Sequence, residues 1–302
     1  MNINRYTGFL CGLMLLLAGL TTAASAASQI VIVKSSDNAY FNQSIETLIN
    51  HVDPLTRFKT VMAEDLTREL EDNENNSFFV TLGQAAAQAV NRLDSGRSSF
   101  GAYLTHEQYK DLQLENQSTV LLDQPLHRYL VFCKLMLAAG SIGLIDDREI
   151  RLDRSQSELL ERLDFELNQY RIDQANKLLP VLRRLLRQND ALLMLPRQSI
   201  YNRDTLKGVL LTSYRIRKPA ISYSPAHVKS GALASIYSSP VDIGRHLAQL
   251  INRKLQYPAH ETPAYQFAKF YSIATNRRIA KALGIELPAE SELRSAIDRL
   301  EP

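Results

Sequence analysis

Short apolar runs alternate with helical segments along most of this chain, and that alternation constrains its fold more than any other feature. The run at 29–34, QIVIVK, is continuously apolar, which is typical of a strand buried on both faces of a parallel sheet. Further apolar runs predict strands at 58–62, 77–82, 99–104 and 118–122. Strands that alternate with helices at this spacing form parallel sheets, so the sequence predicts an α/β fold.

The same unit appears a second time after the polar segment Asp123-Gln124-Pro125. An apolar stripe over 126–137 predicts a helix that begins the second set. The apolar runs that follow predict strands at 141–145, 165–172, 191–195 and 219–223. We therefore expect two Rossmann-like lobes with parallel sheets. The expected boundaries are 27–124 for the first lobe, 125–239 for the second, and 240–302 for C-terminal helices and crossovers, with elements from about 240 onward returning to the first lobe.

The first 26 residues have the pattern of a secretory signal peptide. Arg5 precedes an apolar run over 9–20, and Ala24-Ser25-Ala26 follows as an A-x-A cleavage site. The run is short for a membrane span, which disfavours the alternative of a membrane anchor. The sequence therefore predicts export to the periplasm with removal of residues 1–26.

Charge and cysteine content narrow the partners and the chemistry. The chain has 35 Lys and Arg residues against 32 Asp and Glu residues, so a nucleic-acid partner is not expected. After signal-peptide removal Cys133 is the one remaining cysteine, which excludes an internal disulfide. Its place on the apolar stripe over 126–137 favours a small buried side chain over a nucleophile.

Two C-terminal segments carry clear helix signals. Gly231 precedes an apolar run that predicts a strand, and Ser239 and Asp242 then form a capping box with Pro240 at the first helical position. Apolar residues follow at one helical face, at Ile243, Leu247, Leu250, Ile251 and Leu255. The segment 276–288 predicts a short helix ended by Gly284 and Pro288.

These segments resemble the C-terminal signature of the ABC transporter substrate-binding protein family that includes tryptophan- and tyrosine-binding periplasmic proteins. VKSGALA at 228–234, DIGR at 242–245 and the segment 276–288 match it in residues and in order, and LGQAAA at 82–87 and DQPLHR at 123–128 resemble further family motifs. The resemblance implies a type I periplasmic binding fold. It also implies a monomer that binds a small-molecule ligand and works with an inner-membrane permease or sensor protein.

A ligand is expected where the two sheets face each other, because open parallel sheets bind ligands beyond the carboxyl ends of their strands. The candidate ligand-binding residues of the first lobe are Ser36, Asn38, Tyr40, Gly83, Gln84, Tyr103 and Thr105. Those of the second lobe are Arg197, Tyr201 and Tyr223. Neighbouring loop positions with the same expected placement are Ser35, Asp37, Asp146, Gln198 and Ser224.

Three kinds of chemistry motivate these candidates. The Gly83-Gln84 turn starts a helix and offers backbone N–H groups to an anion. The tyrosines offer flat faces for stacking, and Arg197 offers a bidentate fork to a carboxylate. The alternative for each is an ordinary turn, packing or surface role.

One segment departs from the family pattern. The family commonly shows P-T-D, whose acid is the expected partner of a ligand's amino group, where this chain has LPRQ at 195–198. The family's H-P-x-L-D element is also missing from the first-lobe loop. A cation in place of the acid puts amino-acid specificity in question.

The sequence lacks the motifs of an enzyme, a metal site or a cofactor site. It contains no G-x-S-x-G elbow, Walker loop, H-E-x-x-H or paired-cysteine zinc motif, and its histidines lack helix-face metal spacing. Asp146-Asp147 looks like a loop pair without an acid–base partner. We therefore predict a solute-binding protein for ABC-type uptake, with no catalytic residue, no metal and no cofactor. A periplasmic sensor without transport is the alternative, and an enzyme on the same scaffold is a third, weaker one.

Overall fold

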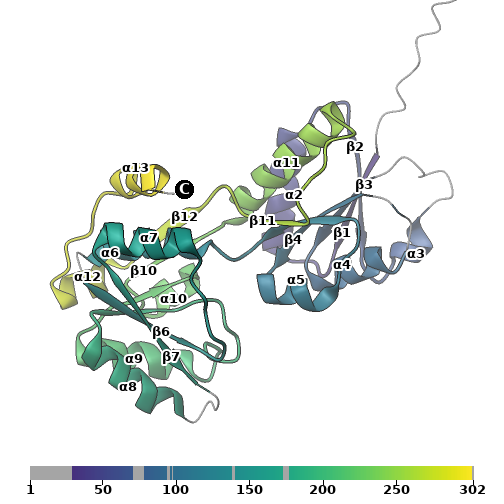
Figure 1. Cartoon of the computed structure of the whole chain (residues 1–302). Coiled ribbons are helices and arrows are strands. Elements are labelled where there is room, and N and C mark those ends of the chain that lie inside the picture. The colour runs from purple at the N-terminus through teal and green to yellow at the C-terminus, as the bar shows by residue number, and fades with distance from the viewer. Residues whose placement is uncertain are drawn as a thin grey trace, which may run out of the picture.

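The computed structural model describes residues 29–70, 78–93, 96, 98–137, 140–172 and 177–300, which fold into two α/β lobes joined side by side (Figure 1). The signal peptide predicted for residues 1–26 lies outside the described residues. Each lobe has one six-stranded sheet, so the predicted fold class, two α/β lobes with mostly parallel sheets, is confirmed.

The sheet of the first lobe is parallel throughout, in the order β11-β5-β4-β3-β1-β2. Its strands are β1 (Gln29–Lys34), β2 (Arg57–Met62), β3 (Phe78–Leu82), β4 (Ser99–Leu104), β5 (Gln117–Leu121) and β11 (Tyr265–Phe267). Its helices are α2 (Ala39–His51), α3 (Leu66–Glu69), α4 (Gln84–Asn91), α5 (His106–Leu112) and α11 (Pro240–Gln256).

The second lobe repeats this layout, in the order β12-β10-β9-β8-β6-β7, with β12 antiparallel to β10. Its strands are β6 (Ser141–Asp146), β7 (Glu166–Arg171), β8 (Ala191–Leu193), β9 (Ala220–Ser222), β10 (Ala234–Tyr237) and β12 (Ser272–Thr275). Its helices are α6 (Leu126–Leu137), α7 (Arg154–Leu163), α8 (Leu178–Gln188), α9 (Leu206–Ile216), α10 (Pro225–Ser230), α12 (Arg277–Leu283) and α13 (Glu290–Leu300).

Three segments connect the lobes. They lead from β5 to α6, from β10 to α11, and from β11 to β12. The chain thus passes from the first lobe to the second, back, and to the second again. These three connecting segments at one junction hold the lobes next to each other. Each lobe keeps its own core.

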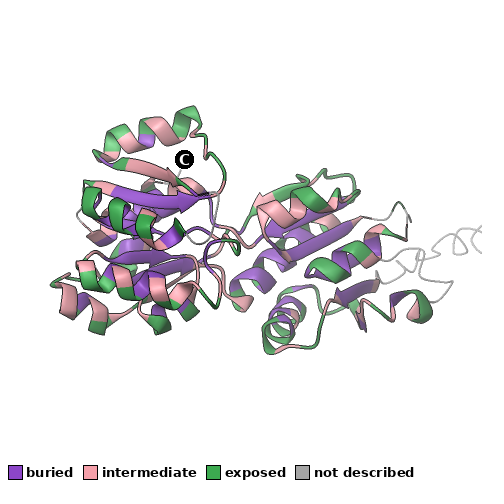
Figure 2. Ribbon diagram, turned by 90° about the horizontal axis from the view of Figure 1, so that it is seen from below, coloured by how far each residue is buried: buried purple, intermediate pink, exposed green. Residues whose placement is uncertain are grey.

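Each sheet is buried between two layers of helices, whose outer faces are exposed (Figure 2). In the first lobe, α2 and α11 cover one face and α4 covers the other. In the second lobe, α6, α7 and α13 cover one face, while α8, α9 and α10 cover the other. Cys133 lies in the second-lobe core with no exposed surface, and burial raises the pKa of its thiol. A neutral buried thiol fits a packing role, as the apolar stripe predicts.

Helix α11 forms as its sequence predicts. The Ser239 hydroxyl accepts a hydrogen bond from the Asp242 N–H, and Asp242 accepts one from the Ser239 N–H. Gly244 then lets α11 approach α2 closely, because a Cβ at this position would lie 2.5 Å from the Ser44 carbonyl oxygen. The capping box and the apolar face of α11 are therefore confirmed, and the helix packs on the first lobe.

The strand expected after Gly231 is shorter than the apolar run. It begins at Ala234, because α10 runs to Ser230, Gly231 caps it with a φ of 124°, and residues 232–233 connect the cap to the strand. The helix predicted at 276–288 ends at Gly284 in the left-handed conformation. The short strands β11 and β12 were not predicted, because their side chains are largely half-buried or exposed and give no apolar run.

Candidate functional site

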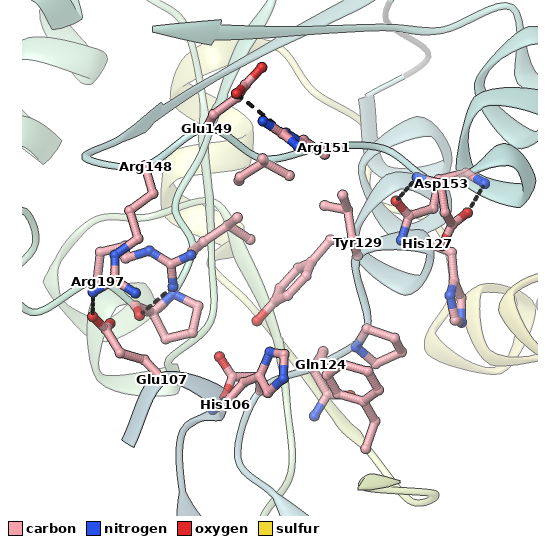
Figure 3. Close-up of a pocket in the computed structure, with 18 of the residues that line it drawn as sticks. His106, Glu107, Gln124, His127, Tyr129, Arg148, Glu149, Arg151, Asp153 and Arg197 are labelled. Carbon is pink, nitrogen blue, oxygen red and sulfur yellow. Dashed lines mark hydrogen bonds and ion pairs between the residues drawn. The ribbon is translucent and has the colours of Figure 1, made fainter. Parts of the chain in front are cut away.

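A cavity of about 690 Å³ lies between the lobes, beside the first and third connecting segments (Figure 3). The first lobe contributes the start of α5, and the second lobe contributes the loops that follow β6 and β8. Its polar lining residues include His106, Glu107, Lys110, Asp123, Gln124, Tyr129, Arg148, Glu149, Arg151, Asp153 and Arg197. The volume suits a small organic ligand.

An ion pair between two strand ends forms the second-lobe wall. Arg197 follows β8, and its Nε donates to Asp146 Oδ1 at 3.1 Å. Asp146 ends β6, is fully buried, and also accepts a hydrogen bond from the Arg148 N–H at 3.0 Å. Burial raises the pKa of the Asp146 carboxyl, and the Arg197 guanidinium opposes that rise. The pair fixes Arg197 at the cavity while its side chain stays 20 % exposed.

The acids at this strand end have structural partners that the sequence analysis did not identify. Asp146 pairs with Arg197, and Asp147 accepts a hydrogen bond from the Ser199 hydroxyl at 2.9 Å. The sequence could not show this, because the partners lie more than fifty positions away and meet through adjacent parallel strands. Both acids act here by holding the loop after β8 in place.

The junction side of the cavity is built by His106 and Asp123. The His106 N–H donates to Asp123 Oδ2 at 2.6 Å, which joins the start of α5 to the first connecting segment. Burial raises the pKa of Asp123, and the His106 N–H and Arg197 oppose the rise. Burial also lowers the pKa of His106, with Lys110 and Arg197 acting in the same direction. At neutral pH His106 is therefore an uncharged hydrogen-bonding group facing the cavity.

Tyr129 lines the cavity, and its hydroxyl points toward His106 (Figure 3). Burial raises its pKa well above the ordinary value, and the Asp123 charge adds to this rise. The hydroxyl stays protonated and can donate a hydrogen bond. On the first-lobe side the His106 ring packs 4.8 Å from Tyr265 and 6.4 Å from Phe267, so an aromatic cluster supports it.

One ion pair crosses the mouth of the cavity from lobe to lobe. Arg148, after β6, donates to Glu107, at the start of α5. Both side chains keep access to solvent, at 61 % and 35 % exposure. A partly exposed pair of this kind contributes little stability and breaks easily. It can therefore hold the lobes together transiently without locking them.

Of the predicted ligand-binding residues, Arg197 lines the cavity in the described structure, and Thr105 is adjacent to it. Thr105 caps α5 by accepting a hydrogen bond from the Gln108 N–H. Tyr223 and Tyr201 lie behind the second-lobe wall rather than on it. Tyr201 is 3 % exposed with burial raising its pKa, and Tyr223 packs edge-on against His227.

The remaining first-lobe candidates contact one another instead of the cavity. Asn38 caps α2 by accepting from the Phe41 N–H at 2.9 Å and donates to the Ser36 hydroxyl at 2.9 Å. Tyr103 donates to the Tyr40 carbonyl at 3.2 Å, and burial raises its pKa to about 12. Tyr40 itself is 68 % exposed.

The Gly83-Gln84 turn starts α4, as predicted, but it serves the fold of the first lobe. Gly83 has a φ of 88°, and a Cβ there would lie 2.8 Å from the Ser35 hydroxyl. That hydroxyl accepts a hydrogen bond from the Ala86 N–H at 2.9 Å, and the Gly83 N–H donates to the Ala102 carbonyl. Within the described structure neither Gly83 nor Gln84 lines the cavity.

Sequence reasoning missed the residues that build most of the cavity, above all His106, Asp123, Tyr129 and Arg148. A usable signal existed for two of them. His106 lies two residues after β4 and Asp123 lies two residues after β5, which are adjacent parallel strands whose carboxyl ends must meet. Tyr129 belongs to the apolar stripe of α6 and gave no polar signal.

Comparison with solved structures identifies the fold. A ligand-free, open substrate-binding protein with adhesive properties from Clostridium difficile superposes with a TM-score of 0.64 at 14% identity, covering 87% of this chain and 97% of that one. An ABC domain in complex with L-Trp from Streptococcus pneumoniae gives a TM-score of 0.52 at 17% identity, covering 88% and 98%. A periplasmic ribose ABC transporter structure from Conexibacter woesei gives 0.51 at 10% identity, covering 88% and 96%. The fold is that of type I periplasmic binding proteins.

Comparisons at the level of sequence add nothing to this assignment. No protein-family model matches the chain, and no curated protein matches it significantly. Across the described ranges, none of the helices has both the length and the apolar character to cross a bilayer. The same residues include no group of three or more His, Cys, Asp or Glu side chains placed to hold a metal ion.

Proposed function

We propose that this protein is the periplasmic solute-binding component of an ABC-type uptake system. The observation that carries the proposal is the cavity at the carboxyl ends of the parallel strands of the two sheets, closed on one side by the segments that connect the lobes. That arrangement lets two lobes approach each other around a bound molecule. Export of the chain by a cleaved signal peptide, residues 1–26, is part of the proposal.

The ligand is a small polar organic molecule, amino-acid-like or similar. Arg197 and Tyr129 offer donors to an anionic or carbonyl group, while Asp123 and Glu149 offer acceptors to a cationic or hydroxyl group. A cavity lined by both charges favours a molecule that carries complementary groups at its two ends. Arg197 is the second-lobe residue that we assign to ligand contact.

Closure works by population shift. A ligand that contacts His106 of the first lobe and Arg197 of the second stabilises the closed arrangement relative to the open one. The ion pair between Glu107 and Arg148 already joins the lobes at the mouth and adds to that bias. The closed form is the one that delivers the ligand to a membrane permease.

Thermal unfolding in the presence of single compounds tests the proposal. The panel comprises aromatic amino acids, nucleosides, pentoses and small carboxylates. A ligand at one hundred times its dissociation constant adds about 2.7 kcal/mol to the free energy of unfolding. Arg197→Ala should abolish that gain, whereas Arg215→Ala, on an outer helix, should retain it. No shift with any compound for the wild type would contradict the proposal.

A sensor that signals to a membrane partner without transport is a second candidate. The observation in its favour is Arg197 itself, a cation paired with Asp146 where the family that the sequence resembles commonly has an acid. Crosslinking in membranes separates the two functions. Capture of a permease supports uptake, and capture of a kinase or cyclase supports sensing. Mass spectrometry of the released ligand should find it chemically unchanged in either case.

A further inference from the structure

Positive charge is concentrated in one segment of the second lobe. Residues 177–218 include ten Lys and Arg residues but two acids, whereas the whole chain has 35 basic against 32 acidic residues. The remainder of the chain is therefore net acidic. Arg197, one of these ten residues, lines the cavity, whereas the other nine lie outside its lining and form an electrostatic feature of their own.

This segment contains α8 and α9, which lie next to each other on the face of the second-lobe sheet opposite α6 and α7 (Figure 1). Leucines on the inner side of α8 pack into the core, and the outer side carries arginines. We call the outer side of the two helices the basic face. Its exposed residues are Arg183, Arg184, Arg187, Lys207, Leu211, Tyr214 and Arg215.

The positive charge of the basic face is not neutralised within the described part of the chain. There, Arg183, Arg187 and Arg215 form no ion pair with a carboxylate, and Arg184 stacks on the Tyr170 ring at 5.5 Å. The acid Asp190 is engaged elsewhere, with Lys218 at 3.1 Å. The face therefore presents several cations to whatever approaches it.

Two exposed hydrophobic side chains lie among these cations. Leu211 is 42 % exposed and Tyr214 is 46 % exposed, one turn apart on α9. Cations around an exposed tyrosine and leucine on a helix face are the residue types that bind an anionic lipid interface, where phosphates meet the first methylene groups. A purely electrostatic contact with an acidic protein would gain nothing from these two side chains.

We propose that the basic face docks on a bilayer surface that carries anionic phospholipid headgroups. The cations attract the headgroup phosphates, and Tyr214 and Leu211 enter the interface. The contact would hold the second lobe at the membrane while the cavity, on other elements, stays accessible. It rests on the charge and exposure of α8 and α9 and is independent of the ligand proposed above.

Co-sedimentation with vesicles tests this proposal. The exported protein is used, with its N-terminus first read by mass spectrometry, and vesicles are made of phosphatidylcholine alone or with phosphatidylglycerol. We expect binding to the anionic vesicles and little to the neutral ones. In the variant with Arg183, Arg187, Lys207 and Arg215 replaced by Gln, we expect the affinity for anionic vesicles to fall by about tenfold or more.

A matched variant removes the same number of exposed cations from other surfaces. It replaces Arg57, Arg253, Arg277 and Lys281 by Gln, all exposed and outside the basic face. Retention of vesicle binding by this variant, together with its loss in the basic-face variant, supports the proposal. Equal losses in both variants, or equal binding to neutral and anionic vesicles, would overturn it. Binding to a soluble acidic protein with none to anionic vesicles would also overturn it.

A further variant tests the apolar part of the contact. Tyr214→Ser leaves every cation in place, so a bilayer contact predicts that this variant binds anionic vesicles more weakly than the wild type. For the same reason, high salt should remove only part of the vesicle binding of the wild type. Vesicle binding that is unchanged by Tyr214→Ser would contradict an interfacial role of α9. Circular dichroism and thermal unfolding of each variant confirm that the fold is retained.

Discussion

The two lobes have the same strand layout but use their strand ends differently. In the first lobe, the loops after β1 and β3 are occupied by internal hydrogen bonds, such as Asn38 to Phe41 and Ser35 to Ala86. In the second lobe, the ends of β6 and β8 carry the Asp146–Arg197 pair, which faces the cavity. Equivalent positions of one architecture thus cap helices in one lobe and form part of the cavity lining in the other.

This difference shows that polar residues at strand ends make two kinds of structural contact. A polar side chain satisfied by a nearby backbone N–H stabilises its own helix. A buried charge held by a partner on the next strand instead needs two elements to be in place. A charge pair between strands therefore makes the cavity wall depend on the whole sheet. The predictions below distinguish such pairs from local helix caps.

Removing the buried acid of the second lobe should have the largest effect on stability. Asp146→Ala leaves Arg197 without its partner and should lower the free energy of unfolding by about 2–4 kcal/mol. The first-lobe counterpart is Asp37→Ala, which removes an exposed pair with Lys34 and should lower the free energy of unfolding far less. Urea unfolding measures both. Equal losses of unfolding free energy in Asp146→Ala and Asp37→Ala would contradict the proposed difference between the strand ends of the two lobes.

Acid sensitivity should come mainly from a histidine of the first lobe. Burial lowers the pKa of His246 to about 4, and its Nδ1 accepts a hydrogen bond from the Lys269 N–H. In the unfolded chain, His246 takes up a proton near the ordinary histidine pKa of 6.5, whereas in the folded protein it does so only near pH 4. Stability contributed by the neutral ring is therefore complete above about pH 6.5 and falls by about 3 kcal/mol as the pH approaches 4.

Unfolding of the wild type and His246→Gln across this pH range measures the effect. The variant should lose most of the decline between neutral pH and about pH 4. His227 of the second lobe is a useful comparison, since burial lowers its pKa too. A decline that persists in His246→Gln and disappears in His227→Gln would place the acid-sensitive group in the other lobe.

Two helical glycines should respond oppositely to the same substitution. Gly244→Ala puts a methyl group against the Ser44 carbonyl and Thr47, and should destabilise the protein by about 1–3 kcal/mol. Gly208, in α9, has ordinary contact space at 3.6 Å from Leu179. Gly208→Ala should therefore stabilise by about 0.5–1 kcal/mol. Thermal unfolding measures both, and the same sign for the two would contradict the close packing of α11 on α2.

The smallest effect is expected for the ion pair between the lobes. Glu107→Gln removes an exposed contact with Arg148 and should change the free energy of unfolding by less than about 1 kcal/mol. It should shift the ligand-free protein toward more open forms, which small-angle scattering detects as a larger radius of gyration. High salt should have the same effect on the wild type. An unchanged radius in both tests would mean that this pair has no part in closure.

The sequence predicted the α/β class and the α11 cap because these depend on local patterns. Continuous apolar runs such as 29–34 and the Ser239–Asp242 box are readable within a few residues. The cavity was harder to predict, since its contacts join residues far apart, as His106 with Asp123 or Arg197 with Asp146. Tyrosines such as Tyr201 look like stacking residues in sequence, but in the structure Tyr201 is buried in the core.

Residue Arg197 illustrates the intermediate case. Its position after a predicted strand was sufficient to propose it for ligand contact, and the structure places it at the cavity. What the sequence could not supply was its buried partner, because Asp146 is the last residue of a different strand. Pairing of β6 with β8 brings the two side chains together.

The central claim, that two lobes close on a small ligand at this cavity, is tested most directly by small-angle X-ray scattering of the purified protein. Scattering is measured with and without the compound that raises its unfolding temperature, for the wild type and for Arg197→Ala. We predict that the compound lowers the radius of gyration of the wild type and leaves that of Arg197→Ala unchanged. A compound that binds the wild type without altering its radius of gyration would contradict the claim.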